Sequence, residues 1–151
     1  MLLSDLVTPE RVLVPLAAEA KNAAIAELAK HLVACSGGTY EDVVRAVLER
    51  EDVLSTGIGF GVAIPHGKSA SMPALGLVCG ISRVPIAYGA VDGEPVRLFF
   101  LIVGPEASAG QHVKVLSRIA RLVRQDAVRE RLLRARTPVE FHEALLAAEE
   151  R

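Results

Sequence analysis

The chain has 151 residues, which is enough for one domain with a hydrophobic core. Hydrophobic residues make up 51% of it and charged residues 23%, a balance that is typical of globular proteins and excludes an intrinsically disordered one. The 17 basic and 18 acidic side chains give a formal net charge of -1. That balance gives no reason to expect nucleic acid or an anionic membrane surface as a partner.

The apolar pattern of the first half predicts a strand followed by two helices. Residues 11–16 are the strand candidate, and residues 18–34 carry apolar side chains at helical spacing up to Gly37 and Gly38, which end that helix. Thr39 is then predicted to cap a second helix, with Val47 and Leu48 on its apolar stripe.

The middle of the chain changes to a pattern of short strands. A glycine-rich turn comes first, and residues 62–64 then form a short strand that Pro65 stops, leaving His66 on the following turn. Two apolar strands follow near residues 75–81 and 96–103, with a shorter strand around Ile86. Their continuous apolar runs suit strands that are covered on both faces.

The last third is predicted to be helical. Ser108 and Gln111 have the spacing of a capping box at the start of one helix, a second helix holds Val128 and Leu132, and Thr137 caps the last. Helices on both sides of a block of strands predict an α/β fold. We expect a mixed β-sheet flanked by helices, an α/β sandwich, in one domain that spans residues 1–151.

Neither cysteine belongs to a recognisable ligand or disulfide pattern. Cys35 and Cys79 are far apart, and neither lies in a CxxC motif or a Cys/His cluster, so we expect free thiols and no zinc site. No charged-then-apolar leader opens the sequence, and the longest apolar runs, such as residues 98–103, are too short to span a bilayer. The sequence therefore predicts a reduced, cytoplasmic protein with no membrane insertion, metal or cofactor.

His66 is the strongest candidate for chemistry. It lies between Pro65 and Gly67 at the end of the short strand, a position that presents one imidazole on a rigid scaffold. Neutral imidazole is a good nucleophile near neutral pH, and glycines at 59, 61 and 67 leave room for a partner or a phosphoryl group to approach the ring. Taken alone, a Pro-His-Gly turn is more often an ordinary exposed turn.

His112 and Arg50 are weaker candidates by themselves. His112 falls in the first turn of its helix, where unpaired N–H groups attract phosphate and favour a neutral imidazole, although a half-buried histidine packed on Leu116 is the simpler reading. Arg50, followed by Glu51, ends the second helix a few residues before the glycine-rich turn. Its guanidinium can bind phosphate, although arginine at a helix end usually faces solvent.

Two rival interpretations fail on context. Gly57, Gly59 and Gly61 suggest a dinucleotide-binding loop, but that motif needs a strand before it and a helix after it, and here the order is reversed. A nucleic-acid surface is suggested by the arginines of the C-terminal third, at positions 118, 121, 124, 129, 131, 134 and 136. They are interrupted by acidic residues and no aromatic side chains interleave with them, so a solvated helical face is the better account.

The sequence resembles the enzyme IIA proteins of the bacterial phosphotransferase system, of the fructose/mannitol type that includes the nitrogen-regulatory branch. Residues 55–68, Ser-Thr-Gly-Ile-Gly-Phe-Gly-Val-Ala-Ile-Pro-His-Gly-Lys, look like the active-site segment of that family. Arg50-Glu51 occupies the Arg-Glu position before it, residues 86–96 resemble the segment that leads into a central strand, and residues 112–116 resemble its His-Leu-x-x-Leu helix start, with Val113 in place of the usual Leu. Several motifs in the right order are far more specific than one.

The resemblance implies a role for four residues. His66 is expected to be the phosphorylated nucleophile, His112 the second active-site histidine, Arg50 a neighbour that stabilises the phosphoryl group, and Thr56 a further hydroxyl donor. The family works through a covalent phosphohistidine and requires no metal or cofactor.

The resemblance also implies the partners. The donor is expected to be the histidine-containing phosphocarrier protein, itself charged by enzyme I from phosphoenolpyruvate, and the acceptor a sugar-specific IIB domain. The alternative is a nitrogen-regulatory IIA, whose phosphorylation state controls binding to regulated target proteins and moves no sugar. The sequence leaves open the sugar, the target and the phosphorylated ring nitrogen.

Overall fold

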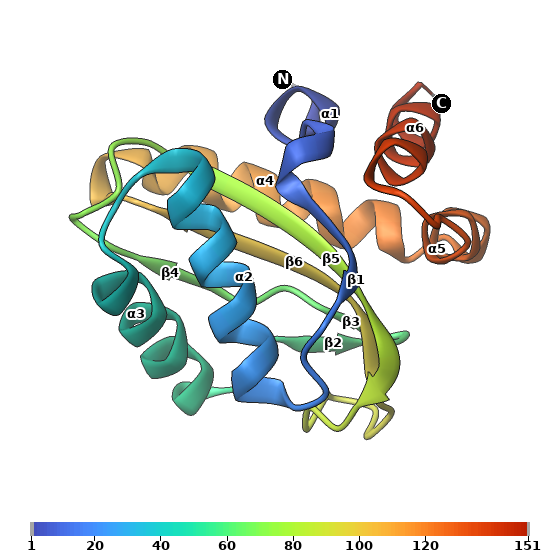
Figure 1. Cartoon of the computed structure of the whole chain (residues 1–151), viewed down its shortest axis with the longest axis horizontal. Helices are drawn as coiled ribbons and strands as arrows, with labels where there is room; N and C mark the ends of the chain where they lie inside the picture. The colour runs from blue at the N-terminus through green and yellow to red at the C-terminus, as the bar shows by residue number, and fades with distance from the viewer. Residues whose placement is uncertain (1, 151) are drawn as a thin grey trace.

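A computed structural model describes residues 2–150 as a mixed sheet between two layers of helices. Figure 1 shows α2 and α3 on the near side of the sheet and α4 on the far side, while α1 and α6 lie together at one end. The helices are α1 (Leu3–Leu6), α2 (Lys21–Ser36), α3 (Tyr40–Val53), α4 (Ala109–Val123), α5 (Asp126–Leu133) and α6 (Pro138–Glu149). The strands are β1 (Val12–Leu16), β2 (Gly57–Gly59), β3 (Val62–Ala63), β4 (His66–Lys68), β5 (Gly76–Ile86) and β6 (Val96–Gly104), and single 3-10 turns cover Pro9–Arg11 and Glu106–Ser108. The predicted fold class is confirmed.

The two long strands form the centre of the sheet. β5 and β6 pair antiparallel, and the strand order across the sheet is β1-β5-β6-β3-β2. β4 also pairs with β6, in parallel, farther along the same edge as β3. β3 and β4 therefore follow one another along one side of β6, and only residues 64 and 65 separate them.

Alternation along the central strands divides the core into two layers. In β6, Leu98, Phe100 and Ile102 pack with α4, α5 and α6, whereas Phe99, Leu101 and Val103 pack with α2 and α3. Successive side chains of a strand point to opposite faces, so a strand covered on both faces is apolar at every position. This is the physical reason for the continuous apolar run that predicted the strand.

Five local predictions differ from the structure. The Thr39 side chain makes no capping hydrogen bond at the start of α3. The predicted glycine-rich turn contains the short strand β2, which pairs antiparallel with β3.

The other three predictions concern His66, Ser108 and Ile86. His66 does not lie on a turn: it begins β4, because the Pro65 carbonyl still accepts the Ile102 N–H (3.1 Å) and keeps the chain against β6, where pairing resumes. Ser108 does not cap α4 with its side chain, because it ends the preceding 3-10 turn with ψ 15° instead of the extended conformation that directs a cap side chain inward. Ile86 belongs to β5 and forms no separate strand.

The start of α6 matches its prediction. The Thr137 hydroxyl accepts the Glu140 N–H at 3.1 Å, and Pro138 occupies the first helical position, where its missing N–H costs nothing. The predicted helix and strand centres elsewhere are also found, with ends shifted by a few residues.

Candidate functional site

The imidazole of His66 is held at the edge of the sheet. His66 pairs with Ile102 of β6, and paired residues of neighbouring strands point to the same face, so its ring lies on the α4 side. The ring is half-buried, and its Nδ1 lies 2.9 Å from the carbonyl oxygen of Ile64. A carbonyl oxygen only accepts hydrogen bonds, so Nδ1 carries the proton and Nε2 keeps its lone pair.

His112 faces this ring from α4. It lies in the first turn of the helix, is only 4% exposed, and its ring centroid is 5.5 Å from that of His66, with an angle of 71° between the ring planes. The structure therefore brings together two histidines that lie far apart in the sequence. The simpler reading of His112 as a half-buried histidine beside Leu116 does not account for this edge-to-face contact.

Burial favours the neutral form of both imidazoles. Burial lowers the pKa of His66, a shift that the nearby Arg50 charge reinforces and that the hydrogen bond to Ile64 and the charge of Glu51 oppose. Burial also lowers the pKa of His112, to about 4, together with the charges of His66 and Lys68 and against that of Glu106. A neutral ring with a free Nε2 lone pair is the nucleophilic form of histidine.

Two cations stand beside the histidine pair. A cavity of about 420 Å³ is lined by Arg50 of α3, by His66 and Lys68 of β4, and by His112 at the start of α4. The Lys68 ammonium lies 3.4 Å from the Glu106 carboxylate, and Arg50 donates to the Leu54 carbonyl at 2.8 Å. A guanidinium and an ammonium at one small cavity suit a group with several anionic oxygens.

The lack of a side chain at Gly67 makes room for α3 and not for a partner. A Cβ at this position would lie 3.0 Å from the backbone carbon of Ala46 and 3.1 Å from the backbone nitrogen of Val47. Because those atoms are backbone, only glycine lets α3 pack this closely on β4. Gly59 likewise faces a neighbour, since its Cβ would lie 3.2 Å from the Asp92 carboxylate.

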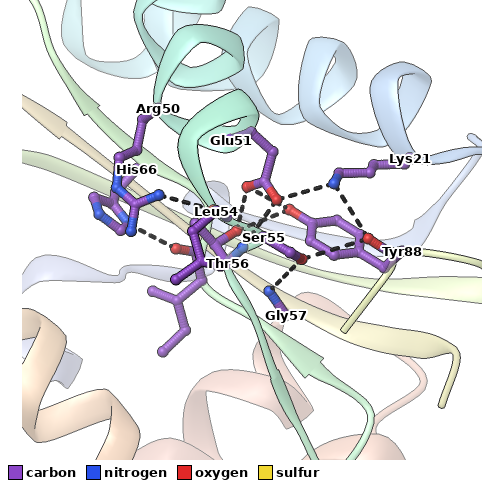
Figure 2. Close-up of polar contacts among 10 residues, drawn as sticks. Lys21, Arg50, Glu51, Leu54, Ser55, Thr56, Gly57, His66 and Tyr88 are labelled. Atoms are coloured by element: carbon purple, nitrogen blue, oxygen red, sulfur yellow. Dashed lines mark hydrogen bonds and ion pairs between the residues drawn. The ribbon is translucent and has the colours of Figure 1, made fainter. Parts of the chain in front are cut away.

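A buried polar network lies behind Arg50 and is centred on Glu51 (Figure 2). The carboxylate of Glu51 accepts the N–H (2.8 Å) and the hydroxyl of Thr56, the hydroxyl of Tyr88 (3.1 Å), and an ion pair from Lys21 (3.0 Å). Burial alone would raise the pKa of Glu51, but the Thr56 and Lys21 contacts outweigh it and hold the pKa below its ordinary value. Glu51 is therefore an ionised carboxylate inside the protein.

Comparison with known proteins places the chain in a family. Residues 5–148 match the family described as phosphoenolpyruvate-dependent sugar phosphotransferase system, EIIA 2. The chain belongs to this EIIA 2 family.

Relatives in two branches resemble this EIIA 2 chain. A nitrogen regulatory protein of Bradyrhizobium diazoefficiens is 39% identical over 137 residues, which cover 90% of this chain and 89% of that one. The fructose-specific EIIABC component of Bacillus subtilis is 40% identical over 90 residues, covering 60% of this chain and 14% of that one.

Solved structures agree with the fold. The nitrogen regulatory protein IIA-Ntr of Neisseria meningitidis matches with a TM-score of 0.88 at 30% identity, covering 95% of this chain and 98% of that one. The IIA protein for mannitol of Escherichia coli, solved in complex with phosphorylated IIB, matches with a TM-score of 0.78 at 23% identity, covering 91% of this chain and 95% of that one, a likeness that shows the fold alone.

Three of the four residues named from the sequence, His66, His112 and Arg50, line one cavity. Thr56 is buried and lines a second cavity together with Arg50 and His66. Its hydroxyl proton is directed to Glu51, so its role as a hydroxyl donor to the phosphoryl group stays a prediction. Lys68 was missed, although its position two residues after His66 in a strand places both side chains on one face.

No group of three or more His, Cys, Asp and Glu side chains among residues 2–150 is arranged to hold a metal ion. In the same residues, no helix combines the length and the apolar character that crossing a membrane demands.

Proposed function

We propose that this chain, as one EIIA type 2 domain over residues 1–151, is a phosphocarrier that accepts a phosphoryl group on Nε2 of His66. The observation that carries the proposal is the pairing of the two rings, with Nδ1 of His66 bonded to Ile64 and the rings 5.5 Å apart at a cavity that also holds Arg50 and Lys68. The donor is the histidine-containing phosphocarrier protein, charged by enzyme I from phosphoenolpyruvate, and the exchange takes place in the cytoplasm.

Transfer requires no proton to leave His66. The Nε2 lone pair attacks phosphorus in line with the nitrogen–phosphorus bond of the donor phosphohistidine; the new bond forms as the old one breaks, and the electron pair of the broken bond returns to the donor ring. Positioning and charge stabilisation then supply most of the rate, without a metal. Arg50 and Lys68 stabilise the oxygens of the transferred group as cations.

His112 supports the product state. Before transfer its ring is neutral, because its pKa is about 4. Once the phosphoryl dianion is on His66, that charge favours a proton on the neighbouring His112 ring and turns it into a stronger hydrogen-bond donor. When the phosphoryl group passes on to the acceptor, His112 loses this proton again and the site returns to its starting state.

The acceptor we propose is a sugar-specific IIB domain. The membership of the EIIA 2 family supports this, as does the fold shared with the IIA protein for mannitol whose complex with phosphorylated IIB has been solved. The test is to phosphorylate the protein with phosphoenolpyruvate, enzyme I and the carrier protein, and then to add purified IIB domains. Loss of label to one of them is the expected result.

A second candidate function, that of a nitrogen-regulatory IIA, is favoured by how much of this chain each relative aligns with. The nitrogen regulatory relative aligns over 90% of this chain, whereas the fructose-specific relative aligns over 60%. In this role the phosphorylation state of His66 controls binding to regulated proteins. Stable label on His66 in the presence of every IIB domain tested would favour it over sugar transfer.

The experiment that tests the common core of both roles is a labelling assay on His66→Ala. We expect no label from the complete donor system, because the accepting nitrogen is gone. Full labelling of folded His66→Ala protein would overturn the proposal. The control is His31→Ala, which removes a histidine of α2 that is hydrogen-bonded to the Glu10 carbonyl and does not line the cavity, and we expect it to label normally.

A further inference from the structure

Glu51 is a buried, ionised carboxylate close to the candidate site. Its side chain is 3% exposed, and a buried charge is tolerated only when it is paired and hydrogen-bonded. Four donors from three different parts of the chain converge on it: Lys21 at the start of α2, the N–H and hydroxyl of Thr56, and the hydroxyl of Tyr88. Two of these four donors belong to Thr56.

We propose that Glu51 is a positioning residue for phosphoryl transfer, which fixes the His66 imidazole through Thr56 and Ile64. This inference rests on the proposed function, since it concerns the same histidine. It assigns to Glu51 no contact with the phosphoryl group and no part in bond making or breaking.

The first link is the clamp on Thr56. The two carboxylate oxygens of Glu51 accept the backbone N–H and the side-chain hydroxyl of the same residue, so Thr56 is held at two points. The Tyr88 hydroxyl lies 3.0 Å from the Thr56 hydroxyl and 3.1 Å from the carboxylate, which closes the network on its third side. Figure 2 shows Thr56 beside Glu51, one residue before β2 begins at Gly57.

The second link runs from Thr56 to the histidine. The Thr56 carbonyl accepts the N–H of Ile64 at 3.0 Å, and the Ile64 carbonyl accepts the Nδ1–H of His66 at 2.9 Å. Ile64 is buried, and it lies between β3 and β4 without being part of either strand. The hydrogen bond between Thr56 and Ile64 therefore holds Ile64 in place, and the Ile64 carbonyl in turn binds Nδ1 of His66 and leaves Nε2 free.

Glu51 also acts on the charge at the site. Its ionised carboxylate favours the protonated form of the His66 ring, whereas Arg50, the preceding residue of α3, disfavours it. The Arg50 guanidinium donates to the Leu54 carbonyl at 2.8 Å, and Leu54 lies between the end of α3 and Thr56. Because Glu51 holds Thr56, it also restrains the short segment before Thr56 that contains Leu54, whose carbonyl accepts the hydrogen bond from Arg50.

The test compares Glu51→Gln with Glu49→Gln. Both changes remove one negative charge from α3, but Glu49 is exposed and lies outside the network. For Glu51→Gln we expect the rate of labelling at saturating donor to fall about tenfold, while the donor concentration for half-maximal rate changes less than about twofold, because positioning affects the chemical step. Glu49→Gln should label like the unmodified protein.

A second readout separates positioning from mere stability. Loss of the Glu51 charge should lower the pKa of His66, followed by NMR, because the carboxylate favours the imidazolium form. A change that only loosens the fold leaves this pKa and the rate per folded molecule unmoved. That pair of results for folded Glu51→Gln would overturn the inference.

The variants Thr56→Val and Thr56→Ser decide the matter if Glu51→Gln does not fold. Valine removes the hydroxyl donor to Glu51 and serine restores it at the same place. We expect labelling of the valine variant to be slowed several-fold and that of the serine variant to recover, whereas equal rates in all three proteins would contradict the inference. A failure of the unmodified protein to take label is a different result, and it would overturn the proposed function instead.

Discussion

Glu51 and Glu149 are two buried carboxylates at different places in the molecule. The exposed fraction of the side chain is 3% for Glu51 and 1% for Glu149. Glu149, at the end of α6, accepts the N–H groups of Leu3 (2.7 Å) and Ser4 (2.8 Å) and pairs with Arg118 (3.4 Å). Each carboxylate therefore accepts a backbone N–H and pairs with one cation.

What each carboxylate holds differs. Glu149 binds the first N–H groups of α1 and so ties the two ends of the chain together, whereas the facing rings of His66 and His112 lie at a different cavity. Glu51 ties down the segment that supports His66. A buried ion pair therefore does not reveal its role by itself. Its role depends on what the groups hydrogen-bonded to the carboxylate are connected to: the chain ends for Glu149, and the support of His66 for Glu51.

The largest effect that separates the two carboxylates is expected for Glu149→Gln. Leaving the α1 N–H groups and Arg118 without their anion should lower the free energy of unfolding by about 2–3 kcal/mol. The labelling rate per folded molecule should stay unchanged. Chemical denaturation measures the first and the donor assay the second, with the neighbouring exposed Glu150→Gln as control; a slowed label in folded Glu149→Gln would erase the distinction between the two carboxylates.

A smaller effect, now at the site itself, is expected for His112→Ala. Loss of the ring beside His66 should slow labelling by about tenfold to a hundredfold, because one stabilising donor to the phosphoryl group is removed. The rate is measured under single-turnover conditions and corrected for the folded fraction. His112→Gln, which keeps an amide donor, should recover part of the rate. An unchanged rate in His112→Ala would return this residue to a packing role.

The smallest effect is expected in the titration of His66. Burial lowers its pKa from the ordinary value of 6.5, so the ring should be mostly neutral at neutral pH and gain its proton only on acidification below that value. Glu149→Gln should leave this pKa in place, since its charge is not among those that act on the ring. An NMR titration of the ring protons measures it, and a midpoint above 6.5 would show that the Ile64 hydrogen bond and the Glu51 charge together outweigh burial and the Arg50 charge.

The sequence predicts the layers of this fold well because the layers depend on local patterns. The apolar run of β6 indicates a strand covered on both faces, and Thr137 with Pro138 marks the start of α6. Ser108 has the right spacing for a cap, but spacing does not reveal the 3-10 turn that fixes its backbone. The local sequence also does not show that strand pairing continues after Pro65, because that pairing depends on the neighbouring strand β6.

The candidate site was predicted in part for a similar reason. His66, His112 and Arg50 were identified through several motifs in the right order, but nothing in their spacing shows that the two rings meet. Lys68 follows from strand alternation once His66 is known to begin β4. The role of Glu51 depends on Tyr88 and Lys21, which reach it from distant parts of the chain, so only the structure reveals it.

The most direct test of the account is to identify the phosphorylated atom. The protein is labelled with its donor system, and the site is assigned by NMR of the phosphorylated ring. Because Nδ1 of His66 donates to the Ile64 carbonyl, we predict one phosphohistidine, at Nε2 of His66. A phosphoryl group on Nδ1 of this ring, or on another residue, would contradict it.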